Sequence, residues 1–373
     1  MGIEIREVLS KKDLRTYIYL PEKIHKNHSN WLPPVYIDEW DYYNTKKNKC
    51  FSYSDTKLLL AWRDGKPVGR IMGIINNKYN DLKGIKQGRF CFLESLDDPE
   101  ISHALISFIE NWAREKGITR MIGPYGFSDK DPQGLMIEGF DIEPVIAAPT
   151  NEEYMVGLLE REGYTKEIDC MQYFCDLANP LPPVYEKINQ RLLSKSEYKL
   201  REFTSKRDLK PFIVPVLSLM NDAFKDLFGY IPMDEQEMKD FANRYITIID
   251  PRFLKIIIYN GKVIAFLLCI PSLTKGIQRA KGRLFPFGFI HILRGIKTTK
   301  HLDLMLGAVH PDYLNVGLIG VLIIKMLESA RAAGFKELEI HLVLETNTPM
   351  SNIMGKIGAT IRKRYRVFQK SIV

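Results

Sequence analysis

Two stretches of the chain decide its fold, and they read alike. Residues 57–75 are KLLLAWRDGKPVGRIMGII, and residues 253–270 are FLKIIIYNGKVIAFLLCI. In each stretch, two apolar runs flank a turn dipeptide, Asp64-Gly65 or Asn260-Gly261. Such dipeptides favour the tight turns of β-hairpins, because the central residues of those turns need a positive φ. Each stretch therefore predicts a β-hairpin, and the pair predicts an internal repeat.

The segments around the hairpins repeat in the same order. Each half opens with a short strand and helical patterns. After its hairpin it continues with a long helix, then a shorter helix that starts at an asparagine and stops at a glycine, and then a last strand. In the first half these segments are 3–8, 14–26, 99–116, 151–163 and 165–175; in the second they are 199–203, 209–227 with 234–249, 316–333, 347–358 and 360–370.

This order predicts an α/β (α+β) protein made of two tandem units. Each unit is expected to be a mixed, mostly antiparallel sheet flanked by helices, spanning residues 1–180 and 195–373. Residues 181–194 start with the proline-rich run Leu181-Pro182-Pro183 and continue into an expected helix, 184–193. Proline clusters break regular structure, so this stretch is predicted to be the linker.

The composition is that of an ordinary globular protein, with 45% hydrophobic and 26% charged residues. No leader sequence and no apolar run of membrane-spanning length is apparent, and the five cysteines form no CxxC pair. We expect a cytoplasmic protein with no disulfide frame and no metal site. The pair His25 and His28, close to Trp31, has no metal-like spacing and is interpreted as part of a turn.

The net charge of +8 is concentrated in one segment, residues 272–300. That segment has seven cations and no acid, and it interleaves them with aromatic and aliphatic residues. Three interpretations stay open: a lid over the acceptor site, a contact for an anionic partner such as CoA phosphates, tRNA or a lipid surface, or an insertion packed against the other half. For the lid, Arg283, Phe285 and Phe287 are the expected substrate-binding residues.

The chain resembles the GNAT superfamily of N-acetyltransferases, and within it bacterial tandem GNAT-like proteins of unassigned substrate. The matching residues are Asn30-Trp31-Leu32-Pro33-Pro34, Gly69-Arg70-Ile71, Gly123-Pro124, Gly139-Phe140, residues 282–288 (GRLFPFG), Leu344-Glu345 and Asn347. The resemblance implies that an acyl-CoA, expected to be acetyl-CoA, binds where the sheet opens beside its fourth strand. Its pyrophosphate would lie on backbone N–H groups at the start of the following helix. An amine of a small molecule or peptide would then attack the thioester.

The second half keeps part of the superfamily's phosphate-binding turn. Gly317 fits the first glycine of that motif, whereas Leu314 replaces its Arg or Gln and Ile319 replaces its last small residue. Glycine inside a helix costs about 1 kcal/mol relative to alanine, so Gly317 and Gly320 indicate close approach of another group. The residues expected to bind the cofactor are Ala308, Val309, Leu314, Asn315, Val316, Gly317, Leu318, Ile319, Gly320 and Asn347.

The equivalent turn of the first half is acidic. Asp97, Asp98 and Glu100 lie where a diphosphate would bind. Two like charges about 4 Å apart at an effective dielectric near 20 repel by roughly 4 kcal/mol. We therefore predict that the first half binds no CoA.

Amine acylation needs a base for the ammonium and often an acid for the leaving thiolate. Many relatives place a tyrosine acid where this chain has Met354. The candidate catalytic residues that remain are Glu345, which follows a predicted strand, His341 on that strand, and Tyr230 in the loop between two helices. Each also has a plain structural interpretation: a turn carboxylate, a packed histidine and a loop-anchoring aromatic.

The favoured function is therefore an N-acyltransferase that uses an acyl-CoA. Two alternatives stay open. A Fem-type aminoacyl transferase, which takes its acyl group from aminoacyl-tRNA, would use the basic segment 272–300 to contact nucleic acid. A non-catalytic ligand-binding protein on the same scaffold would explain Leu314 and Met354.

Overall fold

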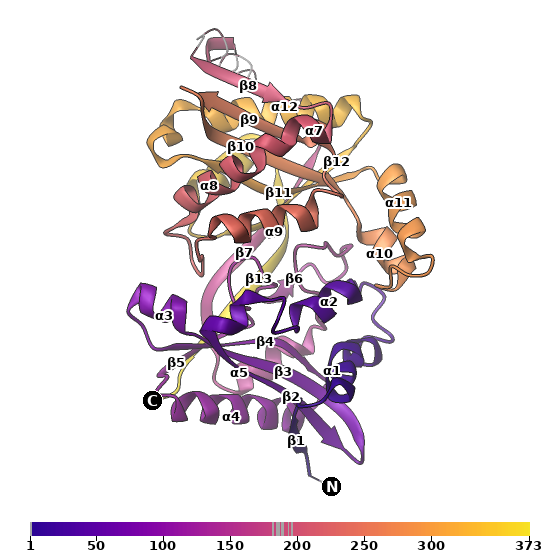
Figure 1. Ribbon diagram of the computed structural model, residues 1–373. Coiled ribbons are helices and arrows are strands. Elements are labelled where there is room, and N and C mark those ends of the chain that lie inside the picture. Colours follow the sequence, from indigo (N-terminus) through magenta and orange to yellow (C-terminus); the bar gives the residue numbers. More distant parts are fainter. Residues whose placement is uncertain (1, 181–182, 184–186, 188–189, 193, 195–196) are drawn as a thin grey trace. The chain divides into compact units, whose positions relative to one another are not determined.

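The computed structural model describes residues 2–180, 183, 187, 190–192, 194 and 197–373 (Figure 1). Its contacts divide the chain into two compact units. Unit 1 comprises Met1–Met171, Leu273–Gly295 and Arg362–Val373, and unit 2 comprises Gln172–Ser272 and Ile296–Ile361. The predicted linker 181–194, with its helix 184–193, lies for the most part outside the described residues.

Both predicted hairpins form. Asp64 and Gly65 have φ values of 51° and 73° between β2 (Ser54–Arg63) and β3 (Lys66–Asn76). Asn260 and Gly261 have φ values of 47° and 77° between β9 (Leu254–Tyr259) and β10 (Lys262–Pro271). The residues at the centre of each turn thus adopt the positive φ that the turn requires, and they are Asp, Asn or Gly, which tolerate it.

Unit 1 is a sheet in the order β1-β2-β3-β4-β5-β13, with β6 paired to β13 and β7 beside it. Strand β4 runs parallel to β5, whereas the pairs β1–β2, β2–β3, β3–β4, β5–β13 and β6–β13 are antiparallel. Its further strands are β1 (Glu4–Glu7), β4 (Gln87–Ser95), β5 (Arg120–Gly123), β6 (Leu135–Glu138), β7 (Thr165–Asp176) and β13 (Thr360–Ser371). Its helices are α1 (Lys11–Ile24), α2 (Tyr36–Tyr42), η1 (Lys49–Tyr53), α3 (Asn77–Lys83), α4 (Pro99–Glu115), α5 (Tyr154–Arg161), α10 (Thr274–Ala280) and most of α11 (Gly288–Thr298).

Alternate side chains of the unit 1 strands enter two different cores. Leu59 and Ala61 of β2 pack with α4 and α5, while Leu60 packs with α1 and α2. Because successive strand residues face opposite sides, the sheet is covered by helices on both faces, as Figure 1 shows for α4 and α1.

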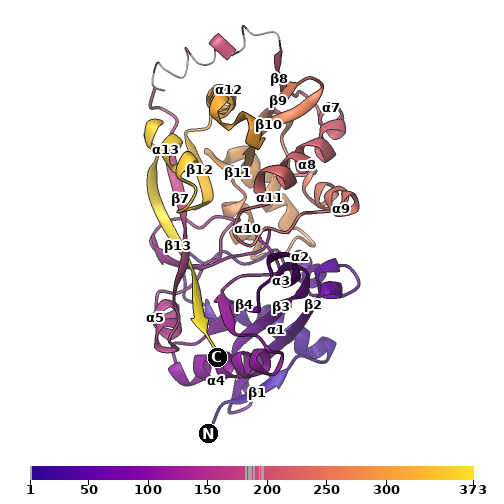
Figure 2. The same ribbon diagram turned by 90° about the vertical axis from the view of Figure 1, so that its left-hand side faces the viewer.

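Unit 2 repeats this plan with the order β8-β9-β10-β11-β12-β7. Strands β11 and β12 are parallel, whereas the pairs β8–β9, β9–β10 and β10–β11 are antiparallel. Its further strands are β8 (Tyr198–Glu202), β11 (His301–Val309) and β12 (Glu337–Leu344). Its helices are α7 (Lys206–Leu209), η2 (Lys210–Phe212), α8 (Ile213–Phe224), α9 (Glu235–Tyr245), η3 (Pro251–Phe253), η4 (Pro311–Val316), α12 (Leu318–Ala332) and α13 (Thr348–Lys356). Leu254 and Ile256 pack with α8 and α9, whereas Lys255 between them donates to Ser329 of α12. Figure 2 shows α8 and α12 on opposite sides of β10.

The last strand of each half was expected to close its own half, and that prediction is wrong. β13, from the end of the chain, pairs with β5 in unit 1, and the end of β7 lies beside β12 in unit 2. Residues 172–180 therefore belong to unit 2 and residues 362–373 to unit 1, unlike the predicted halves 1–180 and 195–373. A strand's own pattern specifies which face is buried and not which neighbour it pairs with, so the sequence could not decide this point.

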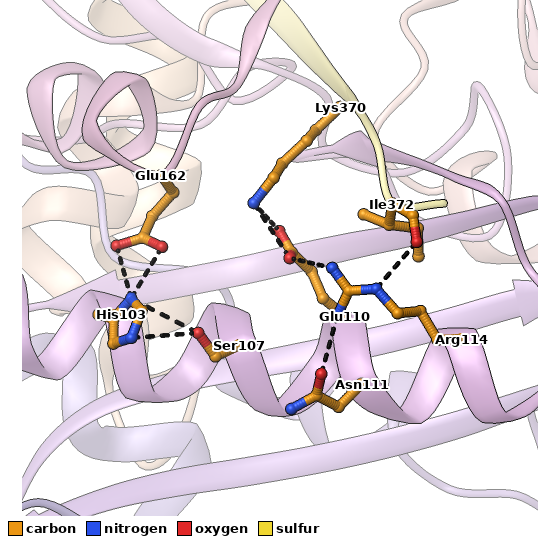
Figure 3. A network of polar contacts seen from close by, with 8 residues as sticks. All are labelled: His103, Ser107, Glu110, Asn111, Arg114, Glu162, Lys370 and Ile372. Atoms are coloured by element: carbon orange, nitrogen blue, oxygen red, sulfur yellow. Dashed lines mark hydrogen bonds and ion pairs between the residues drawn. The ribbon is translucent and has the colours of Figure 1, made fainter.

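Hydrogen bonds and ion pairs of charged side chains connect β13 and the end of the chain to α4 (Figure 3). Lys370 donates to both carboxylate oxygens of Glu110, at 2.8 and 3.0 Å. Arg114 donates to Glu110 and, at 2.8 Å, to the carbonyl of Ile372. The C-terminal strand is thus a structural part of unit 1.

Candidate active site

The expected phosphate-binding turn of unit 2 connects β11 to α12. Gly317 has a φ of 93° and is the N-cap of α12, and no side chain that the structure describes caps this helix. The first backbone N–H groups of a helix have no partner within the helix, so this end can accept an anion. The left-handed φ is itself a sufficient reason for a glycine here, so Gly317 alone does not require a ligand.

The residues expected to bind the cofactor surround this helix start. Ala308 and Val309 end β11, residues 314–316 lie in η4, and residues 318–320 form the first turn of α12. The side chain of Leu314 is 57% exposed, and the backbone of Asn315 lies in the same turn. Asn347 is in a different place, where its carboxamide caps α13 through the backbone N–H of Met350.

The matching helix of unit 1 binds its own carboxylate. Asp98 caps α4 by accepting from the N–H of Glu100 at 2.9 Å, so the anion position is already occupied. Arg63, which the sequence analysis did not consider, donates to Asp98 at 2.5 Å and to Glu100 at 3.0 Å. The hydrogen bond from Arg63 lowers the pKa of Asp98, which keeps the capping group charged.

In both units the central parallel strand pair separates part-way along. The pairing of β4 with β5 is recorded for residues 87–89 and 120–122, and that of β11 with β12 for 301–304 and 337–340. Each central strand also has an irregularity further along: Phe92 has a φ of 51°, and the register of β10 with β11 skips Met305. The two units therefore share a central parallel pair whose pairing stops before the strands end.

The chain's own residues fill this separation in unit 1. The N–H of Tyr125 donates to the carbonyl of Phe90 at 2.7 Å. The buried guanidinium of Arg89 donates to the carbonyls of Gly126 and Phe127. A Cβ on Gly123 would lie 2.5 Å from the Phe90 carbonyl, so the segment that follows β5 lies directly against β4.

In unit 2, three polar side chains gather where the strands separate. Asp303 of β11 is in register with Glu339 of β12, and paired residues of parallel strands face the same side. His341, two residues after Glu339, joins them with its Nε2 3.4 Å from Oδ1 of Asp303. The side chains of His341 and Asp303 are only 2% and 1% exposed.

These groups are notable because their hydrogen-bonding capacity is not used. Among the described residues, neither carboxylate oxygen of Asp303 and neither ring nitrogen of His341 makes a hydrogen bond, although the two side chains lie within ion-pair distance of each other. Glu339 differs, because Gln172 of β7 donates to its carboxylate at 2.9 Å. Buried polar atoms make hydrogen bonds in most proteins, so four atoms in one place that make none to the described residues indicate a site for a ligand or a reacting group.

The trio can act in two ways. A histidine beside a carboxylate can accept a proton from a substrate, with the carboxylate orienting the ring and stabilising its charged form. The three side chains also offer a metal ion one donor atom each, all within 4.8 Å of one another. Asp303 was not predicted as a site residue. The signal was present as a single acid inside the apolar strand LDLMLGAV.

A second group of possible metal ligands lies in unit 1, where the sequence indicated only a turn. His25 and His28 approach through their Nδ1 atoms at 3.1 Å, and Glu152 lies 3.5 Å from His28. Glu94 binds Nε2 of His25 at 2.8 Å, and Trp31 stacks on the same ring. Burial lowers the pKa of His28. Among the described residues, this group and the unit 2 trio are the two sets whose donor atoms could hold a metal.

Two other catalytic candidates have structural surroundings. Tyr230 is fully buried, and its hydroxyl donates to Asn221 at 2.6 Å, which also holds the backbone of Met233. These contacts match the structural interpretation of Tyr230, in which the aromatic side chain anchors the loop. Glu345 is half-buried in the turn between β12 and the capping residue Asn347.

The residues expected to bind substrate lie on the surface of unit 1. Arg283 pairs with Glu22, and its guanidinium lies over the rings of Tyr19 and Tyr36. Phe285 and Phe287 are 73% and 69% exposed. The insertion is therefore packed against its host unit through Arg283, one of the three interpretations that the sequence left open, while its phenylalanines face outward.

Comparisons with known proteins agree with this architecture. No protein-family profile matches the chain. The bacterial ceramide synthase of Caulobacter vibrioides is 27% identical over 377 residues, which covers 99% of this chain and 98% of the relative.

Two solved structures also match over nearly their whole length. A tandem GNAT protein from the clavulanic acid biosynthesis pathway superposes with a TM-score of 0.55 at 13% identity, covering 100% of this chain and 99% of the other. A GCN5-related N-acetyltransferase from Sphaerobacter thermophilus does so with a TM-score of 0.54 at 12% identity, covering 99% and 96%. The chain thus has the tandem GNAT-like fold.

Proposed function

We propose that the chain is an N-acyltransferase in which unit 2 takes an acyl group from an acyl-CoA and transfers it to an amine. The fold it shares with N-acetyltransferases supports the reaction type. The observation that carries the proposal is the buried pair of His341 and Asp303, which lie within ion-pair distance but make no side-chain hydrogen bond among the described residues, where β11 and β12 separate. The start of α12, which no described side chain caps, follows the same strand, and we assign the CoA pyrophosphate to the backbone N–H groups of Leu318 and Ile319 there.

In this proposal, His341 removes the proton of the attacking ammonium, and Asp303 is a positioning residue that orients the ring. The amine nitrogen forms a bond to the thioester carbonyl carbon, the carbon–sulfur bond breaks, and CoA leaves as the thiol. A general base contributes about 10²–10⁴-fold to such a step. No acid is assigned, because the thiol of CoA is a good leaving group and Met354 is a buried helix residue.

The acceptor and the acyl chain are proposed from the relative. A ceramide is an amide of a long-chain amino alcohol with a fatty acid, so a ceramide synthase forms an N-acyl bond on a lipid amine. The similarity at 27% identity spans the whole chain, whereas the 12–13% matches share the fold alone. We therefore propose a long-chain amine and a fatty acyl-CoA, in place of the acetyl donor and small amine expected from the superfamily.

The test is a transfer assay on the purified full-length chain. Acetyl-CoA and palmitoyl-CoA are each offered with a long-chain amino alcohol or with a short polyamine, and free thiol and amide product are measured. We expect amide only from the long-chain pair. Product from acetyl-CoA alone would overturn the substrate assignment, and transfer from aminoacyl-tRNA instead of acyl-CoA would favour the Fem-type alternative.

Leu314 offers a matched pair of variants for the donor site. It is 57% exposed, so Leu314→Glu and Leu314→Gln should both fold and differ only in charge. A carboxylate about 4 Å from a phosphate in water loses about 1 kcal/mol per charge pair, or roughly fivefold in affinity. We expect calorimetry to give a weaker Kd for palmitoyl-CoA with the Glu variant than with the Gln variant. Equal Kd values would mean that the pyrophosphate does not bind at α12.

A further inference from the structure

The insertion between β10 and β11 folds as a tight hairpin of two helices, α10 and α11. A Cβ on Gly276 would lie 2.7 Å from the Cα of Ile292, and a Cβ on Gly295 would lie 3.1 Å from the Cα of Gly276. The two backbones therefore touch through glycines, which fixes one face of α11 against α10.

The hairpin is attached to its host unit by specific bonds. The N–H of Tyr36 donates to the carbonyl of Gly282, and the hydroxyl of Thr274 donates to the carbonyl of Pro144. These attachments hold α10 and the turn before α11, so the opposite face of α11 is presented outward on a fixed support.

Large apolar side chains are exposed on the segment that leads into α11 and on α11 itself. Five large hydrophobic side chains between residues 285 and 293 are exposed, and the described residues elsewhere show no comparable run of exposed large hydrophobics. They are Phe285, Phe287, Phe289, Ile290 and Leu293, with exposures of 73%, 69%, 43%, 48% and 54%. Removing such side chains from water is favourable, and a contiguous exposed patch of this kind marks an interaction site.

The same segment is also strongly basic. Its cations are all exposed, and residues 272–300 contain no acid. Lys275 and Arg283 pair with acids of unit 1, while the side chains of Arg279 and Lys281 are exposed at the C-terminal end of α10, a few residues before the phenylalanines. An apolar face bordered by cations on a short helix is the pattern of a segment that lies in the headgroup region of a bilayer.

We propose that the α10–α11 hairpin is a membrane-surface anchor that inserts its apolar side chains into a bilayer containing anionic lipid. A nucleic acid is the weaker match, because Ile290 and Leu293 can neither stack on bases nor hydrogen-bond to them. A second copy of the chain is also weaker, because it would bring two basic segments together.

The anchor would lie on the membrane rather than cross it. Among the described residues, no helix is long and apolar enough to span a bilayer. Residues Gly288–Thr298 of α11 make a helix of 11 residues, about half of the roughly 20 that a span requires. The proposal rests on exposed side chains, and it does not depend on the proposed N-acyl transfer, although a surface anchor would suit a lipid acceptor.

Vesicle co-sedimentation of the full-length chain tests the anchor. Vesicles of phosphatidylcholine alone are compared with vesicles containing about one third phosphatidylglycerol, at low and high salt. We expect binding to the anionic vesicles that weakens with salt, because the cations are exposed and screened. The double variant Phe285→Asp/Phe287→Asp should bind at least tenfold more weakly. Both side chains are mostly exposed, so its thermal melt should match that of the wild type.

Two control variants separate location from composition. Leu82→Asp removes a 57% exposed apolar side chain on α3, and Lys11→Glu/Lys12→Glu reverses two exposed charges on α1. Neither should change vesicle binding, whereas Arg279→Glu/Lys281→Glu should weaken binding to the anionic vesicles alone. The anchor is overturned if no vesicle binds the wild type, or if Leu82→Asp weakens binding as much as the phenylalanine variant does. Binding of tRNA, or a dimer lost with the phenylalanines, in the absence of vesicle binding would likewise overturn it.

Discussion

The buried carboxyl group of Glu39 in unit 1 allows a quantitative prediction of how the stability of this unit depends on pH. Its carboxyl group lies on α2 among Tyr17, Tyr43 and the guanidinium of Arg70, and its Oε2 is buried without a hydrogen-bond partner. Burial raises the pKa of Glu39 from 4.5 to about 7, although Arg70 opposes the rise. One pKa unit corresponds to about 1.4 kcal/mol, so the folded state disfavours the charged form by about 3 kcal/mol.

The sign follows from proton binding. An acid whose pKa is raised on folding binds more protons in the folded state between the two pKa values. The stability it contributes is complete below the unfolded value of 4.5 and is lost as the pH rises through about 7. Replacing it by the neutral isostere should therefore matter at high pH and not at low pH.

We expect Glu39→Gln to raise the free energy of unfolding by up to about 3 kcal/mol at pH 8 and to leave it nearly unchanged at pH 4.5. Urea unfolding followed by tryptophan fluorescence is a suitable assay, because all four tryptophans, Trp31, Trp40, Trp62 and Trp112, belong to unit 1. The exposed Glu115→Gln on α4 is the control and should show no such pH dependence. A stability difference between Glu39→Gln and wild type that is the same at both pH values would refute the reasoning.

Three further variants test other parts of the chain. His341→Gln should lower kcat/KM for acyl transfer by about 10²–10⁴-fold and leave the Kd for acyl-CoA unchanged; equal kcat/KM would exclude it as the base. Gly276→Ala should loosen the helical hairpin, because its Cβ would lie 2.7 Å from the backbone of α11. Hydrogen exchange over residues 288–298 should then become faster. Gly157→Ala is the control: its Cβ would meet nothing within 4 Å, so exchange in α5 should not become faster. Glu110→Gln should destabilise unit 1 by about 1–2 kcal/mol, less than a fully buried pair, because Lys370 keeps access to water; an unchanged tryptophan-monitored midpoint would contradict it.

The fold was predictable from the sequence to the extent that it depends on local patterns. Asp64-Gly65 and Asn260-Gly261 determine their turns through φ alone, and both hairpins form where predicted. Asn347 caps α13 as its position indicated. Asn151 was expected to do the same for α5, but its carboxamide binds the backbone of Met136 instead, and the helix begins three residues later.

The part that could not be predicted depends on which distant segments become neighbours. Asp303 and His341 are separated by a helix and a loop, and only the parallel register of β11 with β12 brings them together. His25, at the end of α1, and Glu94 of β4 are also far apart in sequence, and they meet only when α1 packs on the sheet of unit 1. Pattern analysis assigns such residues to elements, whereas their chemistry appears only when the sheet is assembled.

In the acidic turn of unit 1, charge is one of two features that would keep CoA from binding. The sequence predicted that Asp97, Asp98 and Glu100 exclude CoA by repulsion, yet Arg63 compensates two of these charges. A second obstacle does not depend on charge, because Tyr125 bonds to the carbonyl of Phe90 where the strands separate. If repulsion alone excluded CoA, Asp97→Ala/Asp98→Ala/Glu100→Ala would raise the stoichiometry of palmitoyl-CoA in calorimetry from one to two per chain. We expect it to remain one, with a loss of about 0.5–2 kcal/mol in stability from the missing helix cap. A stoichiometry of two would show that the filled separation is no barrier, and that charge by itself divides the two units into a binding and a non-binding copy.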